Sequence, residues 1–440
     1  MVLFRRIIML LSFSVKNFGP FQDKVTLSMF PANLKKQHLE HIISTPSFKA
    51  LKGVCIFGAN ASGKTRAISV LPTLRNMIFL RNSPSLLLSN QYMFADGRIS
   101  EFEVDYQIDS IDYRYSVSTD GNIILKESLN LIQKNGNLKP IFERNNLDIT
   151  IGRMLSESEN WYKGRTLKSS SFYLRQLETD GIIDNRDKIA GSEHFIRAYN
   201  FFVGISGIDP VNGNNIELLY GDFTVSGYHN FLEAFLRHAD LGISNVNFEP
   251  LSRDKVEELW KDIIKYYEVS ALTTFKAIWI RDPLSGNFYI LEFKGKELSG
   301  YKMVTYHNNK RFDMLQESSG TIRMIEISIY FYKLITSDNM CLFIDELDCR
   351  LHPFLAEFLL KLHLENNKHN SQLLVTLHEF YLMNSDIWRS DEIWLTEKRL
   401  NGSSDLYSLY QFRPRFDKDL QHGYMRGRYG AIPMLGDFNE

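Results

Sequence analysis

Cysteine, excess charge of one sign and long apolar runs are all scarce in this sequence of 440 residues. Its three cysteines, Cys55, Cys341 and Cys349, cannot form the disulfide framework of a small secreted domain. This usage is typical of a reducing compartment, so we expect a cytoplasmic protein. No stretch is long and apolar enough to span a bilayer, and we therefore expect no membrane contact.

The charge balance excludes a global attraction to nucleic acid. The chain has 51 basic and 52 acidic residues, which gives a net charge of −1. Any contact with DNA or RNA must therefore come from a local basic patch. A composition of 44% hydrophobic and 23% charged residues is that of an ordinary folded chain and excludes disorder or a coiled-coil rod as the main architecture. The length predicts two or three domains.

The apolar patterns predict an α/β fold. Alternation predicts a β-hairpin over residues 10–30, turned at Gly19-Pro20, and an antiparallel meander over 101–130. Residues 150–275 show helical patterns, best seen in a stripe between Val256 and Tyr267. Strands over 274–294 follow, and then a helix and strands alternate in the C-terminal part. The expected helix covers 320–335, and the expected strands cover 340–344, 373–377 and 393–396.

The clearest motif is residues 58–65, GANASGKT, which matches the phosphate-binding pattern G-x-x-x-x-G-K-[ST]. It follows an apolar strand and precedes a helix, which makes a chance glycine-rich turn the weaker alternative. Loop N–H groups would wrap phosphates, Lys64 would reach the β- and γ-phosphates, and the Thr65 hydroxyl would bind Mg²⁺. The motif therefore predicts ATP and Mg²⁺ as ligands. The expected phosphate-binding residues are Gly58, Asn60, Ala61, Ser62, Gly63, Lys64 and Thr65.

Two carboxylates follow the apolar strand 340–344. Asp345 is expected to hold Mg²⁺, and Glu346 is expected to act as general base toward the attacking water. Many edge strands end in acidic residues, so this motif alone is weak. Together with a complete phosphate-binding loop it predicts an ATPase.

Further polar residues stand at the expected ends of other elements. Ser318, Ser319 and Gly320 precede the apolar helix 320–335, where a helix N-terminus can bind an anion. The alternative is a simple serine helix cap. His378 ends the strand 373–377, where a structural role is the alternative. His38-x-x-His41 lacks the H-E-x-x-H form, and no Cys/His cluster has zinc spacing, so no zinc site is expected.

Together these motifs resemble the soluble SMC- and RecF-like branch of the ABC ATPases. They resemble more closely the AAA-family ATPases of prokaryotic defence and abortive-infection loci. Residues 17–21 (NFGPF), 345–353 (DELDCRLHP) and 423–433 (GYMRGRYGAIP) support this likeness. It implies an ABC-ATPase head with lobe I over 9–150, an inserted, mainly helical domain over 151–300 that returns through strands, and lobe II over 301–440. It also implies that the natural chain starts at Met9.

The resemblance assigns further roles. It implies that one ATP lies between two protomers, with Ser319 and Gly320 of one binding the γ-phosphate held by the other. Asp348 would lie in a dimer-contacting loop, His378 would contact the γ-phosphate, and Gln91 would be the Q-loop glutamine. We therefore expect a homodimer, or a larger oligomer, with a composite active site.

Within that group, the ATPase subunits of two-gene systems are the nearest match, such as the PARIS-type sensor and the Septu- and RloA-type ATPases. The short segment after His378 leaves no room for a fused Toprim nuclease, so the effector nuclease, Toprim-like among the options, is expected to be a separate polypeptide. This implies a toxin–antitoxin-like switch that releases the nuclease when a phage product is sensed. The alternative is a RecF- or SMC-like DNA-binding repair ATPase, compatible with basic residues at 413–428. A transporter subunit fits less well.

Overall fold

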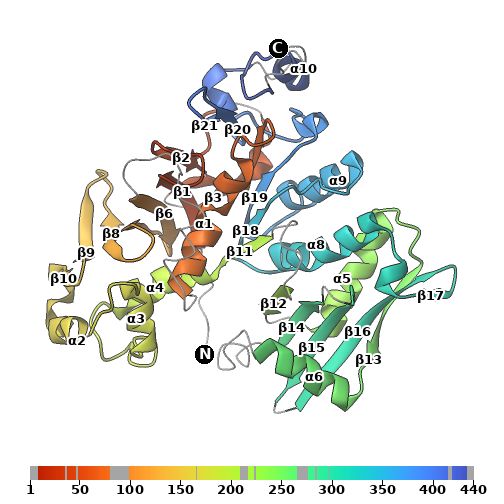
Figure 1. The fold of residues 1–440 in the computed structure, drawn as a ribbon, viewed down its shortest axis with the longest axis horizontal. Helices are drawn as coiled ribbons and strands as arrows, with labels where there is room; N and C mark the ends of the chain where they lie inside the picture. The colour runs from red at the N-terminus through yellow and green to blue at the C-terminus, as the bar shows by residue number, and fades with distance from the viewer. Residues whose placement is uncertain are drawn as a thin grey trace. The chain divides into compact units, whose positions relative to one another are not determined.

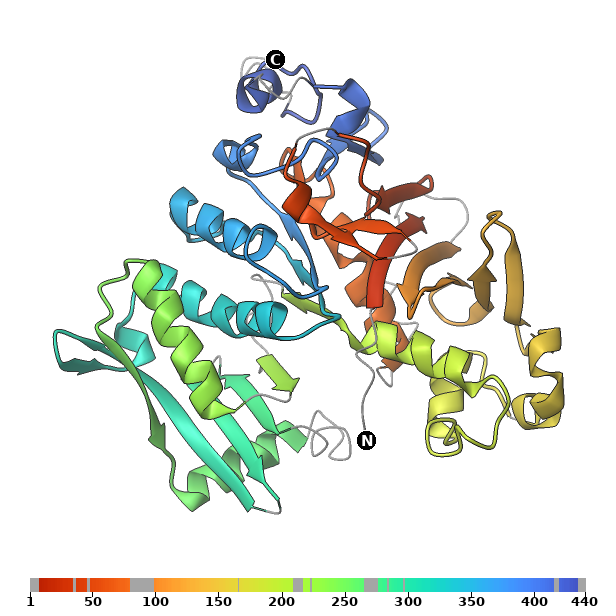
Figure 2. The ribbon, with the colours of Figure 1, turned by 180° about the vertical axis from the view of Figure 1, so that it is seen from behind.

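The computed structural model describes residues 8–34, 37–45, 48–79, 99–164, 166–208, 217–221, 224–264, 276–282, 285–295, 297–414 and 419–433. The chain divides into two compact units. The first unit comprises Met1–Ile208, Ser337–Leu347 and Leu360–Glu440, and the second comprises Asp209–Thr336 and Asp348–Leu359. Figures 1 and 2 show the elements of both units from opposite sides.

An antiparallel sheet forms one layer of the first unit, in the strand order β10-β9-β8-β7-β6-β1-β2. The predicted hairpin over 10–30 is confirmed, because Val15 pairs with Val25 and Phe18 bridges to Phe21 around the turn. The predicted meander is confirmed as β6, β7 and β8. The strands are β1 (Ile8–Lys16), β2 (Val25–Ser28), β6 (Ser100–Ile108), β7 (Ile111–Thr119), β8 (Ile124–Ile132), β9 (Leu138–Asn145) and β10 (Asp148–Ile151).

A second sheet of the first unit runs in the order β11-β18-β19-β5-β20-β21 and is parallel except for the β20–β21 pair. Its strands are β5 (Gly53–Gly58), β11 (Ile205–Ile208), β18 (Cys341–Ile344), β19 (Gln372–Thr376), β20 (Ile393–Lys398) and β21 (Ser404–Ser408). The strands predicted at 340–344, 373–377 and 393–396 are confirmed. Every residue of β18 and β19 is buried, as expected for parallel strands covered on both faces.

Helix α1 (Lys64–Phe79) packs on the parallel sheet, and its Leu71 and Leu74 belong to the same apolar core as Tyr106 of the antiparallel sheet. Gln372 of β19 connects the two sheets by side-chain hydrogen bonds. Its Oε1 accepts from Leu10 N at 2.7 Å, and its Nε2 donates to the carbonyls of Leu10 and Leu51, each at 3.1 Å. The predicted α/β fold, with an antiparallel layer and a mostly parallel one, is confirmed.

The helices α2 (Glu159–Lys163), α3 (Tyr173–Thr179) and α4 (Ser192–Val203) belong to the first unit and pack beside the meander (Figure 1). A buried carboxylate explains this attachment. Glu127 of β8 accepts from the N–H groups of Tyr173 and Leu174 at the start of α3, at 2.7 and 3.0 Å. It also forms an ion pair with Arg144 at 3.3 Å, and both side chains are fully buried. Negative charge at a helix N-terminus is favourable, so one carboxylate holds the helix and the sheet together.

The second unit contains an antiparallel sheet in the order β12-β14-β15-β16-β13, with β17 paired to β16. The strands are β12 (Glu217–Gly221), β13 (Asn245–Pro250), β14 (Ala277–Arg281), β15 (Phe288–Lys294), β16 (Glu297–His307) and β17 (Lys310–Phe312), and the helices are α5 (Val225–His238), α6 (Arg253–Ile264) and α8 (Ser319–Thr336). The expected stripe is confirmed at Val256, Leu259 and Ile263, which pack on this sheet, whereas Tyr267 lies outside the described residues. The helix predicted at 320–335 is α8. The division into domains at 150/151 and 300/301 stays a prediction.

Buried polar groups attach the segment before β3 (Ile42–Ser44) and β4 (Lys49–Leu51) to the loop before β20. Arg389 forms an ion pair with Asp391 at 2.8 Å and donates to the carbonyl of Gln37 at 2.6 Å. His41 Nδ1 lies 3.1 Å from both carboxylate oxygens of Glu392. Burial lowers the pKa of His41 to about 3 and raises that of Glu392, whereas the Arg389 N–H, donating to Glu392 at 2.8 Å, favours the ionised carboxylate. The other α-helices of the described residues are α9 (Pro353–Leu364) and α10 (Leu420–Met425).

Candidate active site

The parallel sheet brings the predicted motifs of the first unit to one edge. Strand β5, which leads into the loop at Gly58, lies between β19 and β20, and β18 lies on the other side of β19. Because these strands are parallel, their carboxyl ends meet: Thr376 pairs with Ile56, and Ile344 pairs with Val375. The residues that follow β18 and β19, including Asp345, Glu346 and His378, therefore stand beside the loop that follows β5.

The loop between β5 and α1 is closely packed where its glycines stand. A Cβ on Gly58 would lie 2.4 Å from the carbonyl oxygen of Thr396, so only glycine fits there. Gly63 has φ +106°, and a Cβ on it would lie 2.7 Å from Pro20. Ser62 Oγ lies 2.6 Å from Thr396 Oγ1 and so ties the loop to β20.

Lys64 is the first residue of α1 and is 5% exposed. Its Nζ donates to the carbonyls of Gly58 at 2.8 Å and Ala59 at 3.2 Å, so the ammonium lies over the loop. Thr65 and Asn60 are exposed on the same short segment. The end of a long helix with its N–H groups directed at this loop is suited to a phosphate.

Asp345 and Glu346 are held by one hydroxyl group. Thr376, at the end of β19 and fully buried, donates from Oγ1 to Asp345 Oδ1 at 2.6 Å. The same Oγ1 accepts from the N–H of Glu346 at 2.7 Å. Glu346 has φ +48°, a left-handed conformation that costs free energy in a residue with a Cβ and is common at active sites. Thr376 therefore positions both acids.

His378 lies next to the second acid. Its Nε2 is 3.0 Å from Glu346 Oε1, and both side chains are partly exposed, 39% and 29%. A histidine and a carboxylate at this distance can share a proton and fix the direction of the carboxylate. Because both side chains are partly exposed, a ligand bound at the loop can reach this pair.

Two residues of this arrangement belong to none of the predicted motifs: Thr376 and Thr396. The sequence signal that could have indicated Thr376 is its place at the end of a buried strand, two residues before His378. For Thr396 the signal is a single hydroxyl in the strand 393–396. Neither signal is specific without knowing which strands are neighbours.

In the second unit, the predicted anion-binding turn begins α8. Ser318 Oγ accepts from the N–H of Thr321 at 3.1 Å. Ser318 is therefore a helix cap, the role considered above as the alternative to anion binding. Ser319 and Gly320 form the first turn, and a Cβ on Gly320 would lie 3.1 Å from the carbonyl oxygen of Arg350. Asp348 lies close in sequence to Arg350 and is buried. The turn and the Asp348 loop are thus neighbours within this unit, while their roles toward a nucleotide stay predictions. Gln91 lies outside the described residues.

A family model described as "AAA domain, putative AbiEii toxin, Type IV TA system" matches residues 54–384, well over half of the chain. The chain belongs to this AAA-domain family. The matched range contains the phosphate-binding loop, both carboxylates and His378. Membership implies nucleotide binding by an AAA-type ATPase, and the loop geometry and the pair of acids fit that ligand.

Among curated proteins, none matches this AAA-domain chain. Two solved structures are similar at 13% identity. The SMC head domain from Thermotoga maritima has a TM-score of 0.37, and the match covers 91% of this chain and 98% of that chain. A structure of the SMC head bound to the C-winged helix domain of ScpA has a TM-score of 0.42 and coverages of 91% and 97%. Neither similarity is close enough to transfer a property to this chain.

Within the part of the chain that the structure describes, no helix is both long and apolar enough to cross a membrane.

Proposed function

We propose that this AAA-domain protein hydrolyses ATP at the carboxyl edge of its parallel sheet. The observation that carries the proposal is the joint placement of three motifs there. The loop 58–65, the pair Asp345 and Glu346, and His378 come from neighbouring parallel strands, and Glu346 lies 3.0 Å from His378.

The loop and Lys64 would bind the phosphates. The N–H groups at the start of α1 supply partial positive charge, and phosphate oxygens would replace the carbonyls of Gly58 and Ala59 as acceptors for the Lys64 ammonium. A cation that already lies over the loop needs only a small movement of its side chain. Binding therefore keeps Lys64 hydrogen-bonded throughout.

Thr65 and Asp345 would hold Mg²⁺, since a hydroxyl and a carboxylate are the hard oxygen ligands that this ion prefers. The carboxylate is 3% exposed and oriented by Thr376, so it is preorganised on the protein side. Bound Mg²⁺ supplies charge neutralisation between the β- and γ-phosphates.

Glu346 would accept the proton of the attacking water. Its backbone is fixed by Thr376 and its carboxylate faces His378, so the base is held in one direction. General-base catalysis by a positioned carboxylate typically contributes about 10²–10⁴-fold. His378, partly exposed beside it, can contact either the water or the γ-phosphate.

The site is proposed to be completed by a second copy of the chain. The N-terminus of α8, with Ser319 and Gly320, lies beside the Asp348 loop and would supply the anion-binding turn that the resemblance to ABC-type ATPases implies. ATP would then join two protomers, and closure of the dimer would depend on the nucleotide.

We further propose that this closure operates a defence switch that holds and releases a separately encoded effector nuclease. The family description, which refers to a toxin of a type IV toxin–antitoxin system, supports this role. The competing function is that of a DNA-binding repair ATPase. A net charge of −1 does not favour the DNA-binding function over the defence switch.

The ATPase is tested by phosphate release from purified wild type, Lys64→Ala and Glu346→Gln. We expect Lys64→Ala to lose ATP binding, and Glu346→Gln to bind ATP with hydrolysis reduced by at least about 10²-fold. Wild-type hydrolysis by Lys64→Ala would show that the site has been placed wrongly.

The composite site is tested by mixing two inactive variants, Lys64→Ala and Ser319→Arg. A mixed dimer would contain one intact site, built from the loop of the Ser319→Arg protomer and the turn of the Lys64→Ala protomer. Random exchange would restore about a quarter of the wild-type rate in a two-fold symmetric dimer. No recovery with confirmed subunit exchange would refute the shared site.

The defence role is tested by a pull-down of tagged Glu346→Gln protein from the native host with Mg²⁺ and ATP. A stoichiometric small nuclease, identified by mass spectrometry, would support the switch. Bound DNA without such a protein, together with DNA-stimulated hydrolysis that falls steeply with salt, would establish the repair function instead.

A further inference from the structure

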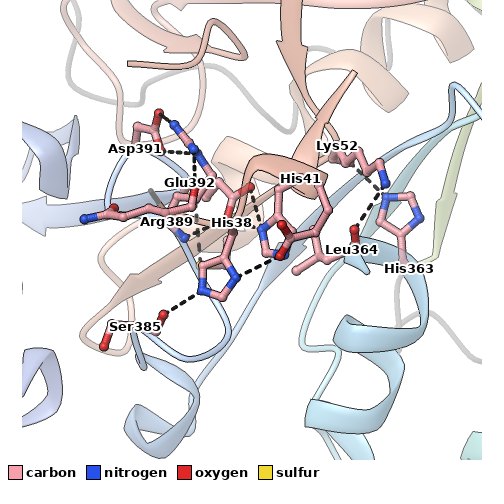
Figure 3. Close-up of polar contacts among 12 residues, drawn as sticks. His38, His41, Lys52, His363, Leu364, Ser385, Arg389, Asp391 and Glu392 are labelled. Carbon is pink, nitrogen blue, oxygen red and sulfur yellow. Dashed lines mark hydrogen bonds and ion pairs between the residues drawn. The ribbon is translucent and has the colours of Figure 1, made fainter. Parts of the chain in front are cut away.

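His38, Glu40 and His41 form a compact cluster in the first unit, at the short 3-10 helix Leu39–His41. Figure 3 shows the two histidines of this cluster. One potential ligand atom from each of the three residues lies within 4.8 Å of the other two. His41 is 1% exposed, His38 17% and Glu40 49%. The cluster is thus built on a buried side chain and opens to solvent at its carboxylate.

The sequence spacing His38-x-x-His41 does not have the form of a known zinc motif. The tight turn at this helix nevertheless brings the two rings together. His38 is the N-cap of this helix, and the N–H of His41 donates to the carbonyl of His38 at 3.1 Å, so a single tight turn separates the two residues. The rings of His38 and His41 accordingly stack, with centroids 4.6 Å apart and planes inclined by 14°. His38 has φ +36°, a left-handed conformation that a structural requirement must maintain.

The outer nitrogen of each ring has a partner that fixes its hydrogen. His38 Nε2 lies 2.8 Å from the carbonyl oxygen of Ser385, which can only accept, so this nitrogen donates. His41 Nδ1 lies at an equal 3.1 Å from both oxygens of Glu392, the geometry of one N–H shared by a carboxylate. Figure 3 shows the His38 ring directed at Ser385 and the His41 ring at Glu392.

The inner nitrogens of both rings lie near one carboxylate oxygen. His38 Nδ1 lies 3.2 Å from Glu40 Oε1. His41 presents its Nε2 to the same oxygen, at 3.9 Å. Either a proton on His38 Nδ1 or a metal cation bound by all three side chains can hold these atoms together.

We propose that His38 Nδ1, Glu40 Oε1 and His41 Nε2 bind a zinc-type divalent transition-metal ion. Two imidazoles and one carboxylate are a known donor set for Zn²⁺, with a fourth position left to water. Tetrahedral ligands about 2.0–2.1 Å from the metal lie roughly 3.3 Å apart. The 3.2 Å contact matches this spacing, whereas the 3.9 Å contact is longer. The two rings are stacked, so His38 and Glu40, the partly exposed members, would have to turn until the in-plane lone pairs of both rings point at the ion.

The outer contacts support the proposal independently. Metal-binding histidines nearly always donate their second N–H to a carboxylate or a backbone carbonyl, which fixes the tautomer and the ring. His41 has the carboxylate of Glu392 and His38 has the carbonyl of Ser385. Glu392 is itself held by the N–H of Arg389 at 2.8 Å.

This site is distinct from the proposed ATP site. Glu392 immediately precedes β20, whereas Thr396, which contacts the phosphate loop, lies near the other end of that strand. The ion would therefore fasten the segment 37–41 to the amino-terminal edge of the sheet. Its role would be structural, and ATP hydrolysis would not pass through it.

The test uses the full chain with any affinity tag removed and stripped of metal with a chelator. Zinc binding is measured by competition with a chromophoric chelator for wild type, His38→Ala, Glu40→Ala and the matched control His422→Ala, which removes an exposed histidine. We expect one Zn²⁺ per chain in wild type and in the control. Each ligand variant should bind more weakly by at least the ~10–100-fold typical of losing an outer-shell partner.

His38 and Glu40 are substituted because both are partly exposed, so their variants should fold. Thermal melting provides the second readout: chelation should lower the melting temperature of wild type and leave that of His38→Ala unchanged. Wild type that binds Zn²⁺ no more tightly than His38→Ala would overturn the proposal and identify the pair His38 and Glu40 as an imidazolium–carboxylate ion pair. A Glu40→Ala variant with wild-type affinity would overturn the ligand set.

Discussion

Thr376 should control the rate of ATP hydrolysis through its hydroxyl group, which contacts both acids. The substitution Thr376→Val keeps the shape and β-branching of the side chain in β19 and removes only Oγ1. Asp345 then loses a donor at 2.6 Å, and the Glu346 N–H loses its acceptor at 2.7 Å. Both acids become less well positioned at once.

The magnitude follows from the hydrogen bond to the charged carboxylate. Such a bond is worth about 1.5–3 kcal/mol. If this free energy is lost in the transition state, the turnover rate should fall by roughly 10- to 150-fold, at ~1.4 kcal/mol per factor of ten. Nucleotide affinity should change less, because the loop and Lys64 are untouched.

The assay is phosphate release at saturating ATP, with equilibrium nucleotide binding and a thermal melt on the same preparation. Thr376→Ser is the matched control, since it retains the hydroxyl, and it should restore most of the rate. A folded Thr376→Val protein whose rate stays within about threefold of wild type, under ~0.7 kcal/mol, would refute the positioning role.

Three other outcomes follow from single features of the first unit. Gly58→Ala should abolish ATP binding in an equilibrium assay, because its Cβ would lie 2.4 Å from the Thr396 carbonyl; wild-type affinity would contradict this. Glu127→Gln should lower the free energy of unfolding in urea by about 3–5 kcal/mol, because it leaves Arg144 buried without its counter-charge; a loss under ~1 kcal/mol would argue against it. Burial lowers the pKa of His363 to about 3, so between pH 6.5 and 3 the unfolded state binds a proton that the folded state does not. Stability should therefore fall with falling pH, and His363→Gln should reduce this slope by about 1.4 kcal/mol per pH unit; equal slopes would show that His363 is not the group responsible.

Much of the candidate site could be predicted because its motifs are local. The loop 58–65 needs only a strand, glycines and a helix in succession, and each of these is a property of neighbouring residues. The acids after β18 and the histidine after β19 were recognisable as polar groups at the ends of apolar runs. Their common location depends on the order of the strands in the parallel sheet, which the motifs do not specify.

Other features could not be predicted because they depend on which distant residues become neighbours. The role of Thr376 requires β18 beside β19, and the role of Glu127 requires α3 to begin above β8. The sheet of the second unit was anticipated only over 274–294, since β12 and β13 are short strands among helices. The pair His38 and His41 gave no metal signal because the helix type that aligns their rings was not evident.

The amino-acid sequence alone thus determined the α/β class, the hairpin and meander, the apolar strands and the phosphate-binding loop. All of these follow from hydrophobic periodicity and from backbone preferences within a few residues. The tertiary structure decided where Asp345, Glu346 and His378 meet, which hydroxyl positions the acids, and which nitrogens of His38 and His41 face Glu40. These arrangements depend on hydrogen bonds and burial between segments far apart in the chain, and only a folded core fixes them.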